Sequence, residues 1–126
     1  MDFDNTFIWN ELMTNDIGKA KAFYAAVAGW TYVDVPMPDG DTYVLARPPG
    51  ASRDVAGLMA WPKDQPGAED WMPYLGVLDI KATLAAVEKA GGTIIRPVFE
   101  VPGTGLIAIA TDANGTALGF LQPEPM

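Results

Sequence analysis

The stretch that decides the fold of this chain runs Phe7-Ile-Trp-Asn-Glu-Leu-Met-Thr-Asn-Asp-Ile-Gly-Lys-Ala-Lys-Ala-Phe-Tyr-Ala-Ala-Val-Ala-Gly-Trp30. Residues 6–13 include β-branched and aromatic side chains in partial alternation, which predicts a strand. Asp16 is a favourable helix N-cap, and Gly29 is typical of the residue after a helix. Between them the apolar residues recur at helical spacing, at Ile17, Ala20, Phe23, Tyr24 and Val27. We therefore predict a strand followed by a capped helix, with Phe23, Tyr24 and Trp30 in the core.

The same order of elements returns half a chain later. Asp79 follows Asp16 by 63 residues, half of the 126 in the chain, and Gly92 follows Gly29 at the same offset. Each half predicts a strand, a helix and three further strands, separated by turn signals such as Asp39-Gly40. One helix covers only one face of a sheet. We therefore predict an α+β fold: two βαβββ modules, 5–61 and 71–122, that form a curved mixed sheet with two outer helices. The polar segment 62–70 would link them within a single domain, 1–126.

The charge and the hydropathy of the chain exclude several kinds of partner. Eight basic residues against 16 acidic residues give a net charge of −8, which repels nucleic acid. No apolar run approaches the roughly 20 residues of a membrane span. The N-terminus lacks the basic region of a signal peptide. We therefore expect a cytoplasmic protein that binds neither nucleic acid nor membrane.

The chain has no histidine and no cysteine. Imidazole and thiolate groups are therefore absent as metal ligands, bases and nucleophiles. The single serine, Ser52, lies in a loop rich in proline and glycine without an activating base nearby in the sequence. Any acid–base chemistry would have to use Asp, Glu, Lys or Tyr side chains.

Three segments resemble the vicinal oxygen chelate superfamily, which includes glyoxalase I, bleomycin resistance proteins and extradiol dioxygenases. Residues 16–30 are similar to its first-helix signature, 71–79 to the strand before its second helix, and Asp112-Ala-Asn-Gly115 to the turn before its last strand. The resemblance covers nearly the whole chain. It implies paired βαβββ modules around a cleft for a small molecule, and it implies a homodimer, because many relatives dimerise.

The resemblance also argues against the usual chemistry of that superfamily. Its metal-using members carry His, Glu or Gln at one position on the first strand and one on the last strand of each module. The matching positions here are Trp9, Met72, Gly119 and a position near Gly57. None of these side chains binds a divalent ion. We therefore expect no metal and no other cofactor.

Candidate pocket residues follow from alternation along the strands. Trp9 alternates with Glu11, and Met72 and Tyr74 match these two through the repeat. The expected ligand-binding residues are Trp9, Glu11, Met59, Met72, Tyr74 and Phe120. The alternative is that the apolar members are core and that Glu11 is a solvated or ion-paired strand residue. Gly57 and Gly119 interrupt strands and indicate either close approach of another group or a bulge.

These features favour a metal-independent binding protein for a small apolar, aromatic or cationic ligand. A second hypothesis is a metal-free enzyme, such as an isomerase, lyase or hydroxylase-like protein, that uses Glu11 or Tyr74 as its acid or base. A third is a domain with a purely structural or interaction role. The sequence leaves these alternatives open.

Overall fold

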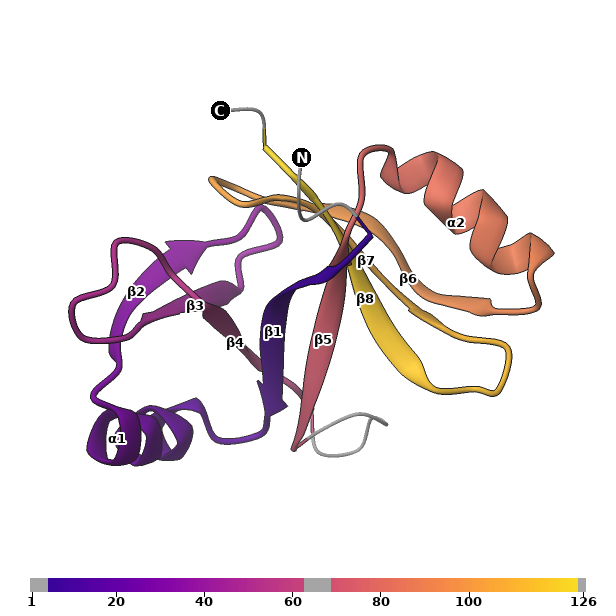
Figure 1. Cartoon of the computed structure of the whole chain (residues 1–126). Coiled ribbons are helices and arrows are strands. Elements are labelled where there is room, and N and C mark those ends of the chain that lie inside the picture. The colour runs from indigo at the N-terminus through magenta and orange to yellow at the C-terminus, as the bar shows by residue number, and fades with distance from the viewer. Residues whose placement is uncertain (1–4, 63–68, 125–126) are drawn as a thin grey trace. The chain divides into compact units, whose positions relative to one another are not determined.

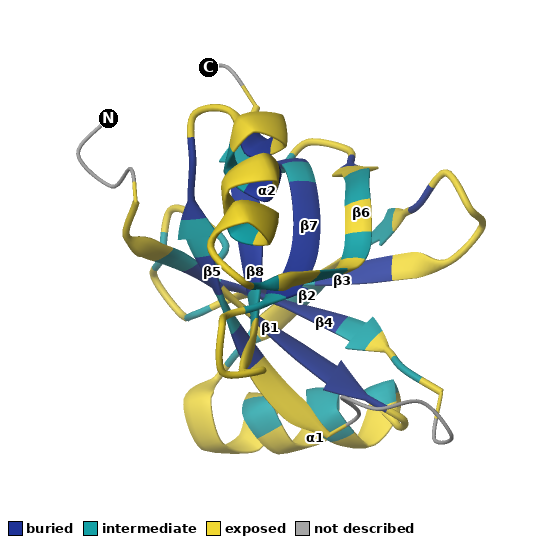
Figure 2. Ribbon diagram, turned by 90° about the vertical axis from the view of Figure 1, so that its right-hand side faces the viewer, coloured by how far each residue is buried: buried dark blue, intermediate teal, exposed yellow. Residues whose placement is uncertain are grey.

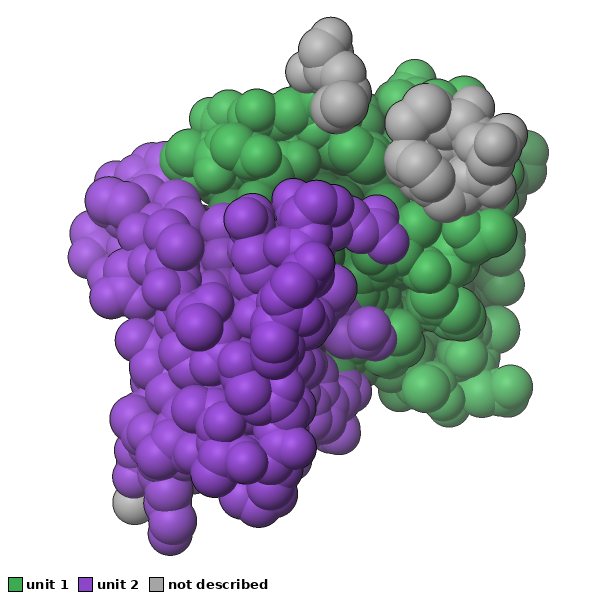
Figure 3. Space-filling view, turned by 60° about the vertical axis from the view of Figure 1, so that its left-hand side comes forward, with its two compact units in different colours: residues 1–9, 72–126 green, residues 10–71 purple. Residues whose placement is uncertain are grey.

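The computed structural model describes residues 5–62 and 69–124, which divide between two compact units (Figures 1 and 3). The N-terminal unit comprises residues 10–71, and the C-terminal unit comprises residues 72–126 together with 1–9. The elements are β1 (Phe7–Thr14), α1 (Ile17–Ala28), β2 (Thr31–Pro36), β3 (Thr42–Arg47), β4 (Ala56–Ala60), β5 (Asp70–Gly76), α2 (Ile80–Lys89), β6 (Thr93–Val101), β7 (Gly105–Thr111) and β8 (Ala117–Pro123).

The N-terminal unit is a mixed sheet with strand order β2-β3-β4-β1. The pairs β2–β3 and β3–β4 are antiparallel, whereas β1 runs parallel to β4. The β2–β3 connection turns at Gly40, whose φ of +92° favours glycine. A buried cluster on one face packs against α1 and is formed by Leu12, Val44, Ala46, Ala56 and Leu58.

Helix α1 begins and ends where the sequence predicts. The Asp16 side chain accepts a hydrogen bond of 2.9 Å from the Lys19 backbone N–H, and Gly29 closes the helix with a φ of +70°. The side chains of α1 depart from the prediction, because none of them is buried (Figure 2). Phe23 is 56% exposed and Val27 is 62% exposed. The prediction that Phe23 belongs to the core is therefore wrong, whereas Tyr24 and Trp30 pack against the α1-side cluster as expected.

The C-terminal unit repeats the plan with strand order β5-β8-β7-β6. Strands β5 and β8 are parallel, and the other two pairs are antiparallel. Helix α2 is capped by Asp79 and buries Ile80 and Leu84 against the sheet (Figure 2). Strand β6 ends the strand order and has shifts of register between Ile94 and Phe99, and Pro97 lies within this edge strand, where a proline is tolerated.

Both units are thus βαβββ modules, and the predicted α+β fold class is confirmed. Most of the predicted linker, 63–68, lies outside the described residues. Neither helix of the described ranges is long and apolar enough to cross a membrane.

Candidate functional site

In the N-terminal unit, a buried carboxyl group lies on the sheet face that points away from α1. Leu12, Val44 and Leu58 pack toward α1, so alternation directs their neighbours Glu11, Tyr43 and Gly57 to the opposite face. The register aligns Glu11 with Gly57. Glu11 is fully buried, and Tyr43 is 1% exposed. Burial of a carboxyl group lowers stability unless hydrogen bonds or charges offset the loss of water, so a group of this kind is a candidate for function.

Gly57 explains how the Tyr43 ring fits into this face. A Cβ atom on Gly57 would overlap the hydroxyl and the ring of Tyr43. The Tyr43 ring therefore lies directly over Gly57, the register partner of Glu11. The predicted close approach is confirmed, and the approaching group is a side chain of the chain itself. Met59, another predicted ligand-binding residue, shares this face and aligns with Tyr43.

The C-terminal unit contains the same arrangement of a tyrosine over a glycine. Tyr74 on β5 aligns with Gly119 on β8, and a Cβ atom on Gly119 would overlap the Tyr74 ring. Tyr74 is fully buried, and Met72, two residues earlier on the same strand, is 6% exposed. Trp9 belongs to this unit as well and is 8% exposed.

Phe120 lies on the other side of the sheet from Tyr74. It belongs to the buried cluster beneath α2, together with Leu84 and Ala108. The register aligns Phe120 with Leu75, so it alternates with Gly119, which Tyr74 covers. The prediction that Phe120 lines the same face as Tyr74 is therefore corrected: Phe120 is a core residue between the sheet and α2.

The residues at the expected metal positions do not fit a metal ion. Trp9 and Met72 offer no oxygen or nitrogen ligand of the kind that a divalent ion prefers, and the space above Gly57 and Gly119 is filled by tyrosine rings. Within residues 5–62 and 69–124, no three Asp or Glu side chains gather in a metal-binding group.

A cavity of about 610 Å³ lies beside α1 in the N-terminal unit, and we call it the α1 cavity. Its lining residues are Leu12, Thr14, Asn15, Asp16, Lys19, Ala20, Phe23, Tyr24, Glu69 and Trp71. One side is aromatic and the other side carries charges. Its volume is within the range of roughly 300–1,000 Å³ that is usual for small-molecule sites.

Glu69 fixes the charged side of the α1 cavity. Its Oε1 accepts hydrogen bonds from the Asn15 backbone N–H at 2.5 Å and from the Thr14 hydroxyl at 2.8 Å. These two bonds lower the pKa of Glu69 below its ordinary value, and the bond from Asn15 has the larger effect. Glu69 also has a φ of +61°, a conformation that residues other than glycine seldom adopt. A carboxylate is thus held charged at the N-terminal end of α1.

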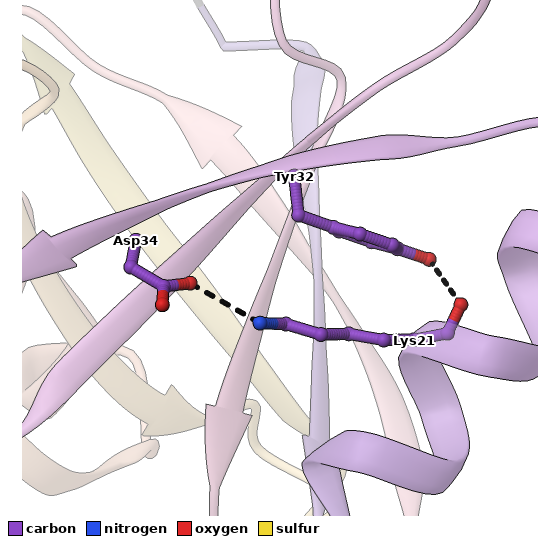
Figure 4. Close-up of polar contacts among 3 residues, drawn as sticks. All are labelled: Lys21, Tyr32 and Asp34. Atoms are coloured by element: carbon purple, nitrogen blue, oxygen red, sulfur yellow. Dashed lines mark hydrogen bonds and ion pairs between the residues drawn. The ribbon is translucent and has the colours of Figure 1, made fainter.

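A second cavity, of about 630 Å³, lies on the other flank of α1 and includes Lys21, Asp34, Asp41 and Trp61 in its lining. The Lys21 ammonium pairs with Asp34 at 3.2 Å, and the Tyr32 hydroxyl donates to the Lys21 carbonyl at 2.9 Å (Figure 4). Burial raises the pKa of Tyr32, and the neighbouring Tyr24 adds to this rise. In this second cavity, the Lys21 ammonium and the Asp34 carboxylate are therefore already paired with each other.

These features define a class of protein: a chain of two βαβββ modules whose sheet faces carry buried tyrosines and a buried carboxyl group. The chain belongs to the Glyoxalase/Bleomycin resistance protein/Dioxygenase superfamily, whose model matches residues 6–120. It is 36% identical over 121 residues to "Putative glyoxylase CFP32" of Mycobacterium tuberculosis, a match that covers 95% of this chain and 45% of that protein. It is 26% identical over 138 residues to "Anthracycline biosynthesis protein DauV" of a Streptomyces species, covering 94% of this chain and 47% of that protein. The chain thus spans less than half the length of these relatives.

Solved structures of the same fold include the methylmalonyl-CoA epimerase of Mycobacterium tuberculosis. That structure has a TM-score of 0.67 at 19% identity and covers 94% of this chain and 88% of its own. An epimerase variant from Streptomyces coelicolor gives a TM-score of 0.70 at 13% identity, with 94% and 97% covered. At these identities the likeness extends to the fold alone.

Two residues of these sites are not evident from the sequence. The position of Tyr43 over Gly57 depends on the pairing of β3 with β4. The two strand glycines were the usable signal, since a glycine within a strand indicates close approach. Glu69 was read only as part of a linker, and no local pattern indicates that it folds back onto Thr14 and Asn15.

Proposed function

We propose that this chain is a metal-independent binding protein for a small, partly aromatic or cationic organic molecule, and that it acts in the cytoplasm. The observation that carries the proposal is the buried Glu11 beside the Tyr43 ring, next to Gly57, which offers no side chain to a metal ion. Such a face combines apolar surface with a few polar groups, which is the usual composition of a ligand site. In the C-terminal unit Trp9, Met72 and Tyr74 are the proposed ligand-binding residues, and in the N-terminal unit Glu11 and Met59.

Thermal unfolding in the presence of a small-molecule panel tests this proposal. A ligand that binds only the folded state stabilises it, by about 2.7 kcal/mol at a concentration one hundred times its Kd. We expect at least one aromatic amine or neutral aromatic compound to raise the Tm, and we expect Tyr74→Phe or Glu11→Gln to reduce that rise. A panel that leaves the Tm unchanged throughout would contradict the binding function.

The second candidate is a metal-free enzyme, and the complete burial of Glu11 favours it. A buried carboxyl group can serve as a general base, with Tyr74 as the alternative acid–base group. The relatives named as a putative glyoxylase and as an anthracycline biosynthesis protein support a small organic substrate. Glu11→Gln separates the two candidates: lost turnover with retained binding favours catalysis, whereas weakened binding without any turnover in the wild type favours the binding protein.

We also propose that the chain forms a homodimer. The curated relatives are about twice as long as this chain, so a dimer would supply a comparable amount of folded protein. Light scattering coupled to size exclusion measures the mass directly. A mass of one chain, 13.5 kDa, at micromolar concentration would contradict the dimer.

A further inference from the structure

The α1 cavity has an aromatic wall that is already in place. Tyr24 stacks on Trp30 with ring centroids 5.0 Å apart and an angle of 23° between the ring planes. Trp71 donates its indole N–H to the Tyr24 hydroxyl at 3.1 Å, and Phe23 packs edge-on against Tyr24 at 5.0 Å. These contacts hold the rings in position although Phe23 remains 56% exposed and Trp71 remains 37% exposed. A ligand that binds there would therefore lose little binding free energy to the ordering of these side chains.

The opposite side of the α1 cavity carries two anions. Oε1 of Glu69 and Oδ1 of Asp16 accept the backbone hydrogen bonds at the start of α1. Within residues 5–62 and 69–124, the second oxygen of each carboxylate makes no hydrogen bond. Each carboxylate therefore keeps one oxygen for a ligand. The low pKa of Glu69 keeps it ionised at neutral pH.

The charge balance at the cavity favours a cation over an anion. Among the described residues that line the cavity, Lys19 is the one cationic side chain, against the carboxylates of Asp16 and Glu69. The net charge of −8 on the whole chain adds attraction for cations. Aromatic rings attract cations as well, and more strongly where water is excluded.

We propose that the α1 cavity is a second binding site, which takes a small organic cation: an ammonium group on a flat aromatic or alkyl body. The body packs on Phe23 and Trp71, and the ammonium group is held by Asp16 and Glu69. This site lies on the helix side of the N-terminal sheet, opposite the face of Glu11. It does not depend on the function proposed above.

Titration of the ¹⁵N-labelled full chain with benzyltrimethylammonium chloride tests this site, with phenylacetate as the anionic comparison. We expect saturable shifts at the Trp71 indole N–H and at the backbone of residues 15–24 for the cation, weakening as salt is added. Phe23→Ala should raise the Kd by about 3–30-fold, the factor that corresponds to one cation–π contact. Glu69→Gln should raise the Kd by about 1.5–5-fold, the factor that corresponds to one solvent-exposed ion pair. Lys19→Gln should lower the Kd, because it removes the competing cation.

Matched controls keep the result specific to this cavity. Phe7→Ala removes another exposed phenylalanine, and Glu88→Gln removes a carboxylate from α2, so neither should change the Kd. The proposal is overturned if the cation gives no saturable shifts, or if phenylacetate binds instead and Lys19→Gln abolishes its binding. It is also overturned if Phe23→Ala changes the mass of the particle, which would make this face an interface between copies. Loss of ligand binding in Glu11→Gln with cation binding retained here would show that the two sites are separate.

Discussion

At the scale of single residues, Gly57 is a position where a small change should have a large effect. Gly57→Ala places a methyl group where the Tyr43 hydroxyl and ring lie, and Tyr43 is buried with little room to move. Overpacking of this kind costs about 1–3 kcal/mol. We expect urea unfolding to show a loss of stability in that range.

Gly18→Ala is the matched control for Gly57→Ala. Its nearest neighbouring atom is an Asp16 side-chain oxygen at 3.8 Å from the added Cβ, which is ordinary van der Waals contact. Alanine favours a helix over glycine by up to about 1 kcal/mol, so this variant should be neutral or more stable. Equal effects of the two variants would contradict the account of Gly57.

Glu69 should make stability depend on pH. Because its folded pKa is lowered, its carboxylate stabilises the folded state above the ordinary glutamate value of 4.5, and the contribution is lost as the pH falls through the folded pKa. We expect Glu69→Gln to reduce the dependence of the unfolding free energy on pH below 4.5. Denaturant unfolding at a series of pH values measures it. Glu88→Gln makes the same charge change without these hydrogen bonds, and a matching reduction in that variant would refute the assignment.

At the scale of elements, the two helices differ in how many side chains they bury. Helix α2 buries Ile80 and Leu84, whereas α1 buries no side chain. Leu84→Ala should cost about 2–5 kcal/mol, because it removes buried methyl groups and leaves a cavity. Val27→Ala on α1 should stay within about 0.5 kcal/mol, the usual range for a surface change. Chemical denaturation measures both, and a larger loss for Val27→Ala would show that α1 is packed in solution by something else.

The elements were predictable because their signals are local. Asp16 and Asp79 cap their helices, and Gly29 ends α1, through contacts with residues three or four positions away. The exposure of Phe23 was not predictable from the sequence. The helical period places Phe23 on the apolar stripe of α1, but it does not determine whether the sheet extends far enough to cover that side chain. The opposite sides taken by Tyr74 and Phe120 follow from the register of β5 with β8, which involves residues far apart in the sequence.

At the scale of the whole molecule, the chain should function without a metal. The sequence has no His or Cys, and the described residues contain no metal-binding group of acids. We expect that EDTA, and separately stoichiometric Mn²⁺, Ni²⁺ or Zn²⁺, will leave the Tm unchanged, because an ion bound only to the folded state would raise it. Elemental analysis of the purified protein is the direct measurement. One tightly bound ion per chain would refute the prediction.

The parallel pairing within each unit has a consequence for the kinetics of folding. The hairpins β2–β3 and β7–β8 join neighbouring segments, whereas Asn10 must find Ala56 and Tyr74 must find Gly119 before a unit closes. Hairpins form in roughly 1–10 μs, and pairing between distant segments is slower because the intervening chain must first lose entropy. Each unit should therefore fold from its hairpins toward its parallel strand pair. The first strand of each module in the sequence, β1 or β5, would therefore be the last to pair with its neighbouring strand.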